Sequence, residues 1–567
     1  MKKIILIFLV INSINLNAQT YVYGGHIGGW IDDKAVDIDK ISDGNILTTS
    51  ANTSFGLKGL YKINDLGNIV WAFNEMTSTS QNFYSFLNTV TDEQDNIYSL
   101  LYINSTPNST FIFNGKTYYS GVNLVKMNTN GNIIWVKKIG NLEQSGATVL
   151  FKNNNIYILG QFTGQININN QITLNSQQYF QCSTWINEQG NDFFIAKFDS
   201  IGNLINAISF GEDYDDFMVD ATIDNDENIY FTGCSDFYFC AERYTHITKY
   251  SSSLNFIWKK ELSKEVNGSQ LIYPSNIFVS QNNKLYVWGY NLDIVSTINY
   301  TLNKPCYTNT NNWSPTANII EFNKSNGAFQ RNYQFTTCTS NGVFFVNGNY
   351  QTLDGNNGFM TDFDNDLLIY TSFRRPIVFS NNTYSPTYDT YTSQFNENLL
   401  LMRMKLSNFT PEFITKFDGQ NQANGYISID NPKGISIDSN NNLLLTGSFK
   451  ENPLNILGNP ISNNSGNNST DVLYTKLNLN SLLSINENLS IQNNLIVYPN
   501  PTDNFLKVKY NDEIDEIKLY NIIGELILET KNFETPILNV ESLIDGIYFI
   551  DFYFENKRIE RKKFIKK

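Results

Sequence analysis

The sequence predicts an all-β protein: a seven-bladed β-propeller followed by a small immunoglobulin-like β-sandwich. Three observations support this fold class. Among 567 residues, aromatic residues make up 14% and charged residues 17%, and this mix, rich in Asn and Gly, suits strands and tight turns. A strand–turn–strand pattern recurs along most of the chain. After about residue 495 this repeat stops and a different alternation of short strands begins.

The N-terminus has the pattern of a secretory signal peptide. Lys2 and Lys3 form a basic start, residues 4–11 are an unbroken apolar run, and Ala18 is a small residue before the expected cleavage point. We therefore expect residues 1–18 to be removed. The apolar run is far shorter than the ~20 residues that span a bilayer, and no later stretch is long enough, so we expect no transmembrane segment.

The repeat between residue 31 and about residue 485 alternates two units. In the first unit, an apolar strand turns at Asp, Asn or Gly into a second strand, as in residues 223–233. In the second unit, an apolar strand ends in a charged residue and another strand follows. Those charged residues are Lys62, Lys126, Lys197, Lys249, Lys405 and Lys476, with Glu321 in one copy, and Trp71, Trp135 and Trp258 follow three of them by nine residues.

Two units give four strands, and seven such copies predict a propeller. An isolated four-stranded sheet exposes both faces, whereas sheets packed around an axis cover one another. A β-helix needs shorter coils, and a string of sandwiches would not repeat this closely. We place the propeller at residues 20–485 and a linker at residues 486–494.

The last copy lacks an expected fourth strand, and the N-terminus offers one. Residues 482–486 contain no aromatic residue at the expected place, while residues 21–26 precede the first copy. We predict that the strand near Tyr21 to Tyr23 pairs with the strand around Tyr474. This pairing would cover an exposed sheet edge.

Two copies of the repeat contain a recognisable sequence motif. Residues 32–39 read D-D-K-A-V-D-I-D and are followed by D-G-N-I, and Asp215 and Asp216 precede a similar strand ending at Gly233. This motif resembles the bacterial extracellular propeller repeat D-D-x-A-x-x-I-x-x-D-x-x-G-N-I-Y-x-x-G. The resemblance implies a fold but no activity, because propellers host many functions.

Residues 495–567 contain short alternating strands with Gly and Asn turns, which favour a small β-sandwich. Y-P-N-P at residues 498–501 is followed by L-Y-N-x-x-G at residues 519–524, by G-I-Y at residues 546–548 and by a basic end. This order of landmarks strongly resembles the type A C-terminal sorting domain of type IX secretion cargo in Bacteroidetes. The resemblance implies export through the periplasm and delivery to the medium or the outer-membrane surface. It also implies two partners, the type IX secretion machinery and a surface sortase that removes the domain. The landmarks are a basic end at residues 562–567 and Tyr498, Pro499, Asn500, Pro501, Gly524, Gly546 and Tyr548.

Strand alternation places the short turns on one face of the propeller and the long connections on the other. The long connections hold Tyr and Trp among Asn and Ser, and variable loops on a rigid scaffold are the usual place for binding. We predict a ligand site on this face around Trp185, Tyr238 and Trp313. The alternative interpretation is that these aromatic residues pack the loops onto the blades.

The five cysteines are expected in connections on the same face. An oxidising compartment permits disulfides. Cys234 is close to Cys240 in the sequence, and Cys306 could meet Cys338 across neighbouring connections. Cys182 could displace either member of the first pair.

Composition excludes several function classes. The net charge of −14 leaves no basic footprint for nucleic acid, and two histidines, His26 and His246, are too few for a multi-histidine metal site. The acidic cluster at residues 212–216 overlaps the turn consensus of the repeat. The Asp-rich turns at residues 224–227 and 362–366 lack the EF-hand spacing for calcium, so we expect hairpin turns.

We therefore expect no metal, no cofactor and no catalysis. The expected function is binding of a glycan or a surface protein by a secreted propeller. The alternative is an extracellular enzyme that degrades polysaccharide with acidic residues on the long-loop face.

Overall fold

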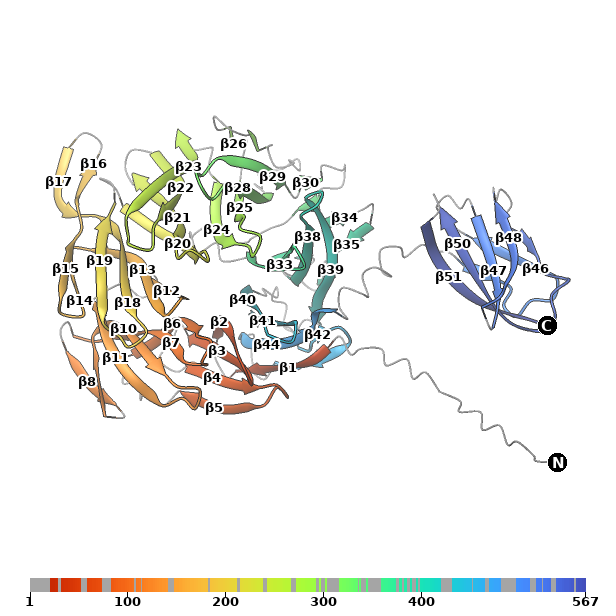
Figure 1. Cartoon of the computed structure of the whole chain (residues 1–567), viewed down its shortest axis with the longest axis horizontal. Coiled ribbons are helices and arrows are strands. Elements are labelled where there is room, and N and C mark those ends of the chain that lie inside the picture. The colour runs from red at the N-terminus through yellow and green to blue at the C-terminus, as the bar shows by residue number, and fades with distance from the viewer. Residues whose placement is uncertain are drawn as a thin grey trace, which may run out of the picture. The chain divides into compact units, whose positions relative to one another are not determined.

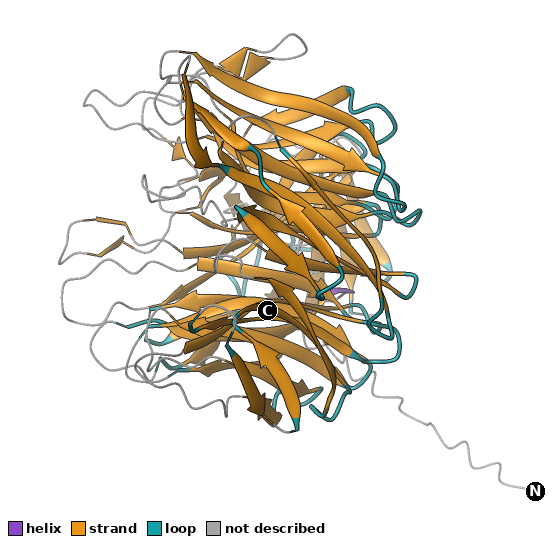
Figure 2. Cartoon of the chain, turned by 90° about the vertical axis from the view of Figure 1, so that its left-hand side faces the viewer, coloured by secondary structure: helices purple, strands orange, loops and turns teal. Residues whose placement is uncertain are grey.

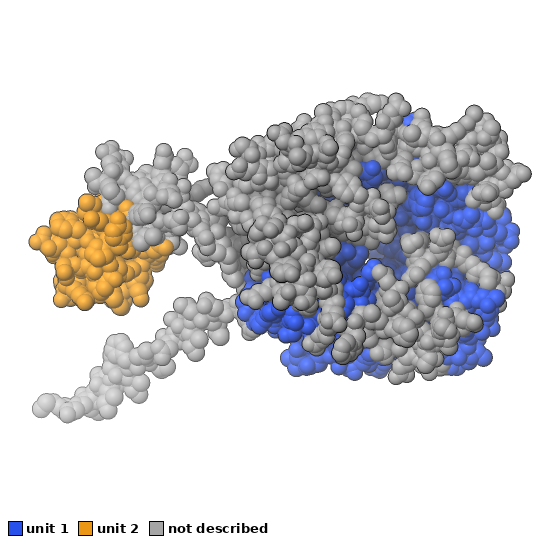
Figure 3. Space-filling model, turned by 180° about the vertical axis from the view of Figure 1, so that it is seen from behind, with its two compact units in different colours: residues 1–481 blue, residues 482–567 orange. Residues whose placement is uncertain are grey.

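The structure is a computed structural model of the chain, and two compact units, residues 1–481 and residues 482–567, are distinguished in it (Figure 3). Each unit is described by itself below. The residues that the structure describes are 21–28, 32–51, 59–73, 83–106, 109–113, 115–140, 147–181, 184–211, 215–237, 242–266, 272–291, 295–296, 301–302, 316–334, 336–337, 343–344, 358–373, 377–379, 382–384, 388–389, 394–395, 398–419, 431–450, 452–463, 469–480, 496–509, 516–522, 524–531, 537–554 and 557–567. The expected signal peptide at residues 1–18 and the linker at residues 486–494 lie outside them.

In the described part of the first unit, seven antiparallel sheets follow one another along the chain. In order of hydrogen-bonded neighbours, the first four sheets are β2 (Asp33–Ile41), β3 (Gly44–Ala51), β4 (Gly59–Asn64), β5 (Ile69–Phe73); β6 (Phe83–Thr91), β7 (Ile97–Asn104), β10 (Gly121–Met127), β11 (Ile133–Gly140); β12 (Ala147–Lys152), β13 (Asn155–Thr163), β18 (Asn191–Asp199), β19 (Leu204–Phe210); and β20 (Asp215–Ile223), β21 (Ile229–Phe237), β22 (Glu242–Tyr250), β23 (Phe256–Val266).

The remaining three sheets follow the same plan. They are β24 (Ile272–Val279), β25 (Leu285–Asn291), β28 (Thr316–Phe322), β29 (Phe329–Gln334); β32 (Gly358–Phe363), β33 (Asp366–Phe373), β38 (Asn398–Lys405), β39 (Thr410–Gly419), extended by β42 (Leu454–Ile456) and β43 (Asn459–Ile461); and β40 (Asn431–Ile437), β41 (Asn442–Phe449), β44 (Asp471–Asn478), β1 (Tyr21–Ile27).

Short hairpins lie in the connections between the second and third strands of several sheets. They are β8 (Thr110–Phe113) with β9 (Lys116–Tyr119), β14 (Gln165–Ile168) with β15 (Ile172–Asn175), β16 (Gln178–Gln181) with β17 (Thr184–Gln189), β26 (Val295–Ser296) with β27 (Thr301–Leu302), β34 (Ile377–Phe379) with β35 (Asn382–Tyr384), and β36 (Tyr388–Asp389) with β37 (Gln394–Phe395). A further hairpin, β30 (Thr336–Thr337) with β31 (Val343–Phe344), follows β29.

The seven sheets form a propeller-like ring (Figure 1). The first strand of each sheet contacts the first strands of both neighbouring sheets, in the order β2, β6, β12, β20, β24, β32, β40 and back to β2. Buried apolar clusters fill the spaces between sheets; one of them joins Leu100 and Leu124 of the second sheet to Ile156 and Phe194 of the third. The expected all-β fold is confirmed.

The ring closes with the N-terminal strand. β1 pairs antiparallel with β44, with Tyr23 opposite Lys476 and Gly25 opposite Tyr474. The predicted pairing of the strand near Tyr21 with the strand around Tyr474 is therefore confirmed. β1 and β44 are more than 400 positions apart in the sequence, so the four-stranded form of this sheet needs both ends of the first unit.

In five of the seven sheets, the repeated Lys of the sequence ties the sheet to the next one. Its ammonium group reaches the turn between the third and fourth strands of the following sheet. The bonds are Lys62 Nζ to Thr129 Oγ1 (3.1 Å), Lys126 Nζ to the Ser200 carbonyl (2.9 Å), Lys197 Nζ to the Ser252 carbonyl (2.9 Å), Lys249 Nζ to the Lys324 carbonyl (3.0 Å) and Lys476 Nζ to Asp65 Oδ1 (2.6 Å). We call these bonds the lysine latches.

The copy with Glu321 in place of Lys is also joined to the next sheet, in this case through an arginine. Glu321 holds Arg331 (Nε to Oε2, 2.6 Å), and Arg331 donates to the Leu406 carbonyl of the sixth sheet (3.2 Å). The repeated Trp also acts between sheets, since Trp71 Nε1 donates to the Thr129 carbonyl (3.0 Å). Gly131 of that turn has a φ of +79°, and a Cβ there would lie 3.2 Å from the Trp71 ring, so both the backbone and the packing favour glycine.

The described part of the second unit contains two facing sheets around a core of its own. One sheet has the order β45 (Ile496–Tyr498), β46 (Phe505–Lys509), β49 (Ile537–Asn539), and the other has the order β48 (Leu526–Lys531), β47 (Glu516–Asn521), β50 (Gly546–Phe554), β51 (Lys557–Lys566). Leu506, Ile517, Leu519, Ile550 and Phe564 are among the buried residues of this core.

Candidate functional site

The predicted ligand site on the long-loop face falls mostly outside the described residues. Trp185 lies in β17, in the hairpin between β13 and β18, so it belongs to a connection between second and third strands as expected. Tyr238 and Trp313 lie outside the described residues. The site therefore stays a prediction.

The cysteines are placed only in part. Cys182, Cys240, Cys306 and Cys338 lie outside the described residues, so the two expected pairings stay predictions. Cys234 is buried inside β21, opposite Phe217 and Thr245. The expectation that every cysteine lies in a connection is wrong for Cys234, because β21 continues to Phe237.

The opposite face, which carries the short turns, is described in detail. Short turns gather along one side of the first unit (teal in Figure 2). Polar bonds join turns of neighbouring sheets: Ser42 donates its backbone N–H to Asp95 (2.8 Å), Lys152 Nζ donates to Asn225 Oδ1 (2.7 Å), and Asn282 Nδ2 donates to Asn365 Oδ1 (2.6 Å). We call this surface the short-turn face.

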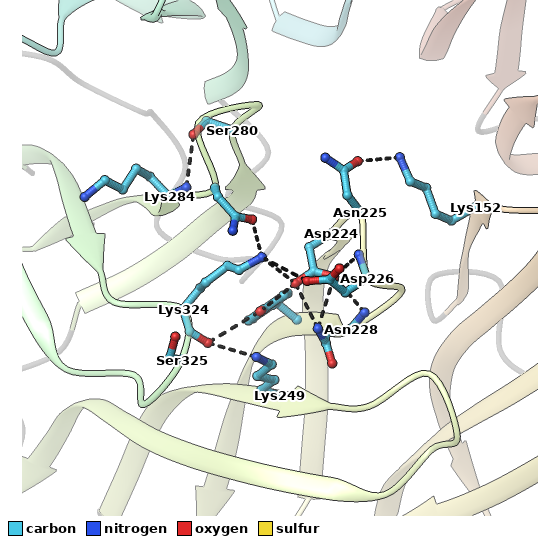
Figure 4. A network of polar contacts seen from close by, with 12 residues as sticks. Lys152, Asp224, Asn225, Asp226, Asn228, Lys249, Ser280, Lys284, Lys324 and Ser325 are labelled. Carbon is cyan, nitrogen blue, oxygen red and sulfur yellow. Dashed lines mark hydrogen bonds and ion pairs between the residues drawn. The ribbon is translucent and has the colours of Figure 1, made fainter.

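The Asp224 turn shows how these turns are built (Figure 4). Asp224 Oδ1 accepts the N–H groups of Asp226 (2.9 Å) and Asn228 (2.8 Å), which closes the hairpin. Lys324 of the next sheet places Nζ 2.8 Å from Asp224 Oδ2. Burial alone would raise the pKa of Asp224, but Lys324 and the other donors outweigh burial and lower it. The expectation of a hairpin turn at residues 224–227 is confirmed, and Asp366 in the other Asp-rich turn binds Arg403.

The acidic cluster at residues 212–216 is described from Asp215 onward. Asp215 accepts the backbone N–H of Asn191 (3.0 Å), and buried Asp216 accepts the hydroxyl of Ser235. Both carboxylates therefore bind neighbouring strands, as a structural role requires.

The centre of the ring holds a set of polar side chains that sequence reasoning did not single out as a site. The first strands of five sheets have a register shift at the same place, and the residues just after it are Asp37, Asn88, Asp220, Asn276 and Gly434. The shift is the signature of a β-bulge, which re-aims the side chain that follows it. We call Asp37, Asn88, Asp220 and Asn276 the inner polar belt.

The inner polar belt links neighbouring sheets. Asn88 Nδ2 donates to Asp37 Oδ2 (2.8 Å), while Asn88 Oδ1 accepts the Val149 N–H of the third sheet (2.9 Å). Between the fourth and fifth sheets, Asp220 Oδ2 accepts from Asn276 Nδ2 (2.7 Å) and from the Ile277 N–H (2.9 Å). The belt carboxylates thus serve as acceptors for their neighbours.

Burial makes two belt carboxylates hard to ionise. It raises the pKa of Asp37 to about 7, with the Asp39 carboxylate as a further cause, and raises the pKa of Asp220 to about 7. Perturbed carboxylates often mark functional sites, but structural networks perturb them too. Here each carboxylate accepts bonds from backbone or amide groups of the ring, which supports a structural role.

Both histidines have structural partners. His26 Nδ1 lies 2.9 Å from Asp471 Oδ2 on the closing sheet. His246 is fully buried, its Nδ1 lies 3.1 Å from Thr248 Oγ1, and the rings of Phe193 and Phe231 stand nearly perpendicular to it. Burial, with Lys259 nearby, lowers the pKa of His246 well below its usual value, so His246 is neutral at physiological pH.

Among the described residues, no group of three or more His, Cys, Asp or Glu side chains is arranged to hold a metal ion. The same residues contain no helix with the length and apolar character needed to cross a membrane.

The landmarks of the C-terminal unit have structural roles in it. Asn500 Nδ2 donates to the Lys563 carbonyl (3.0 Å) and Asn500 Oδ1 accepts the Ile565 N–H (2.9 Å), so the start of the unit is tied to its last strand. Tyr548 donates to the Ile544 carbonyl (2.8 Å) and stacks on Phe564. Gly524 has a φ of +84°, which favours glycine.

Residues 496–567 match the family described as the secretion system C-terminal sorting domain. This match supports type IX secretion cargo and implies export to the cell surface or the medium. No curated protein matches the chain.

Solved structures resemble the chain only distantly. A Fusarium graminearum α-L-arabinofuranosidase in complex with an iminosugar inhibitor is 7% identical, with a TM-score of 0.38 over 80% of this chain and 100% of that one. A Dyadobacter fermentans protein of unknown function is 9% identical, with a TM-score of 0.36 over 81% and 98%. A Pyrococcus horikoshii acylaminoacyl peptidase is 8% identical, with a TM-score of 0.37 over 85% and 59%. These scores carry no argument about activity.

Proposed function

We propose that the chain is a secreted or surface-displayed binding protein, a seven-bladed β-propeller carried to the cell surface by a type A sorting domain with an immunoglobulin-like fold. Residues 1–18 direct it to the periplasm, and the type IX secretion machinery then moves it across the outer membrane. A surface sortase removes the sorting domain. The observation that carries the proposal is the sorting-domain match at residues 496–567, which form a unit with a core of its own.

The ring supports a binding role because it is rigid and closed. The lysine latches, the inner polar belt and the bonds of the short-turn face fix the sheets to one another. Connections between second and third strands leave this scaffold on the other face, and loops on a rigid scaffold are the usual place for recognition. We place the ligand, a glycan or a surface protein, on that face around Trp185, Tyr238 and Trp313.

The proposal assigns no catalytic residue, and one experiment separates binding from catalysis. The purified chain is incubated with a panel of bacterial and plant polysaccharides and with outer-membrane proteins. Retention without release of shortened product supports the binding protein. Release of oligosaccharides would instead identify a polysaccharide-degrading enzyme and overturn the proposal.

A variant with Trp185→Ala, Tyr238→Ala and Trp313→Ala tests the location of the site. Truncating aromatic anchors commonly costs ~2 kcal/mol or more, so affinity should fall by about thirtyfold. The thermal unfolding temperature should stay within a few degrees. A large fall in that temperature would show that these residues pack the loops, and unchanged affinity would place the ligand elsewhere.

A further inference from the structure

Most of the exposed apolar side chains of the first unit lie along one part of the rim of its ring. Eleven large apolar side chains are exposed in the described part of this unit, and nine of them belong to the first four sheets. These nine lie on the fourth strands, on the turns before the fourth strands, or on β8. They are Leu66, Ile69, Val70, Ile112, Ile134, Ile201, Ile205, Phe256 and Ile257. Exposed apolar patches mark contact sites for other molecules, either proteins or membranes.

A repeated β-bulge places an aliphatic residue on this rim. In the second sheet, the register of the third and fourth strands shifts, so that Ile134 has no residue of its own opposite it. The same irregularity falls at Val70, Ile205, Ile257 and, in the closing strand, Val22. A bulge re-aims a side chain, and all five residues are exposed, by 37% to 54%. The exposure of these residues therefore recurs with the repeat.

The rim of the second and third sheets carries a group of isoleucines that we call the isoleucine patch. Its members are Ile112, Ile134, Ile201 and Ile205, which are exposed by 81%, 40%, 70% and 52%. Lys116, in the hairpin that carries Ile112, donates Nζ to the Ile134 carbonyl (2.8 Å). The turn that carries Ile201 rests on β11, since a Cβ on Gly202 would lie 2.6 Å from Lys137 Cε and 3.0 Å from the Trp135 ring. β8, β11 and β19 lie on the outside of the ring (Figure 1), and Figure 2 views the molecule from this side.

The charges beside the isoleucine patch are positive. β8, β9, β11 and β19 together contain Lys116, Lys137 and Lys138 and no Asp or Glu, although the whole chain has a net charge of −14. Asp199, at the end of β18, accepts the Ile201 N–H (3.1 Å) and so holds the turn. Lys137 lies over the ring of Trp135 (5.8 Å) and Lys138 lies over the ring of Tyr119 (5.9 Å). The patch is therefore aliphatic with a cationic and aromatic border.

We propose that the isoleucine patch binds an anionic lipid surface. Aliphatic side chains enter the boundary between headgroups and acyl chains, and lysine stems keep their ammonium groups at the level of the anionic headgroups. Trp and Tyr, which border the patch, are the aromatic residues that favour this level. A protein partner fits less well, because the cores of protein interfaces are depleted in Lys and enriched in Arg, Trp and Tyr.

Flotation of the purified full chain with lipid vesicles tests the proposal. Vesicles of equal parts phosphatidylglycerol and phosphatidylethanolamine supply the anionic surface, and phosphatidylcholine vesicles supply a neutral one. The chain should bind the anionic vesicles about tenfold more tightly than the neutral ones. Raising the salt from ~0.1 M to ~0.5 M should weaken binding to the anionic vesicles several-fold, because salt screens exposed charges.

A double substitution tests the aliphatic contacts. Ile201→Asp with Ile205→Asp puts two carboxylates where the acyl chains are expected and should weaken binding at least about tenfold. Val22→Asp is the matched control and should leave binding unchanged. Val22 stands at the same bulge of a fourth strand and is exposed by 37%, but its strand belongs to the closing sheet and contains no lysine.

A second double substitution tests the charges. Lys137→Gln with Lys138→Gln removes two positive charges beside the patch and should weaken binding to the anionic vesicles by about thirtyfold. Binding to neutral vesicles should hardly change, and most of the salt dependence should disappear. Thermal unfolding of every variant confirms that the fold is intact.

Several results would overturn the proposal. They are a chain that floats with neither kind of vesicle, binding that the two isoleucine substitutions leave unchanged, and an equal loss in Val22→Asp. Retention on purified outer-membrane proteins without binding to bare lipid would identify a protein partner instead. The proposal does not rest on the proposed function, and polysaccharide retention is measured without vesicles, so each can fail without the other.

Discussion

The two compact units differ in how many large apolar side chains they expose for their size. Both units bury charged side chains: Lys476 is 3% exposed in the first unit and Asp551 is 1% exposed in the second. In the second unit, ten large apolar side chains are exposed among the described residues of a 72-residue match, about as many as the eleven in the described part of the far larger first unit. For its size, the described part of the second unit therefore exposes more large apolar side chains than that of the first.

Removing Lys476, the lysine latch between the seventh and first sheets, has the largest expected effect on the first unit. Lys476 Nζ lies 2.6 Å from Asp65 and 2.7 Å from Asp438. Burial alone would lower the pKa of Lys476, but the two carboxylates outweigh burial and raise it. Lys476→Met leaves buried Asp438 without its cation and should lower the free energy of unfolding of the first unit by about 3 kcal/mol.

Lys126→Met is the matched control for that substitution. Lys126 occupies the same repeat position and donates to a backbone carbonyl, without a carboxylate partner at ion-pair distance among the described residues. Its loss should cost about 1 kcal/mol. Chemical denaturation followed by tryptophan fluorescence measures both variants. Equal losses would contradict the account of the ring closure.

Removing the half-buried carboxylate of Asp220 should stabilise the first unit at alkaline pH. The pKa of Asp220 is about 7 in the folded chain against ~3.9 in an unfolded one. The folded state therefore holds its proton more tightly, so this stability is fully present below pH ~4 and is lost as the pH rises through about 7. Asp220→Asn mimics the protonated form and should raise the free energy of unfolding by about 2 kcal/mol at pH 8.

The same substitution should have little effect at pH 4, and Asp37→Asn should behave in the same way. Denaturation curves at pH 4, 6 and 8 measure the difference. A destabilised Asp220→Asn variant at pH 8 would show that the carboxylate is ionised there and needed in that form.

The smallest expected effect concerns His246. Here stability is lost as the pH falls, whereas for Asp220 it is lost as the pH rises. The pKa of His246 lies well below its usual value in the folded chain, so the unfolded chain takes up the proton first. The stability that His246 contributes is present above pH ~6.5 and is lost as the pH falls below it, by ~1.4 kcal/mol per pH unit at most. His246→Phe should flatten this acid limb between pH 6 and pH 5. An unchanged slope in the denaturation midpoints would assign the acid sensitivity to other groups.

Much of the first unit could be predicted from sequence because its pattern is local and repeated. Asn and Gly turns between apolar strands predict the sheets, and the missing fourth strand of the last copy predicts that β1 closes the ring. The role of the repeated Lys in joining sheets could not be predicted, because its hydrogen-bond partner lies in the next sheet. Lys126, for example, bonds Ser200, which is 74 residues away in the sequence.

The candidate site was harder to predict for a physical reason. The inner polar belt depends on bulges that re-aim Asp37 and Asp220 toward a neighbouring strand, and a bulge has no clear mark in a single sequence. Cys234 was misplaced because strand ends cannot be fixed from alternation alone, and β21 extends three residues beyond it. Among the landmarks of the second unit, Gly524 marks a local turn with a positive φ, which a sequence pattern can show.

Cell fractionation of a chain that ends at residue 495 tests the central claim most directly. The claim is that residues 496–567 direct the export of the first unit, which folds without them, to the cell surface. The truncated chain should accumulate in the periplasm with the protease resistance of the folded first unit, while the full chain reaches the surface or the medium. Delivery of the truncated chain to the surface in the amount seen for the full chain would contradict the account.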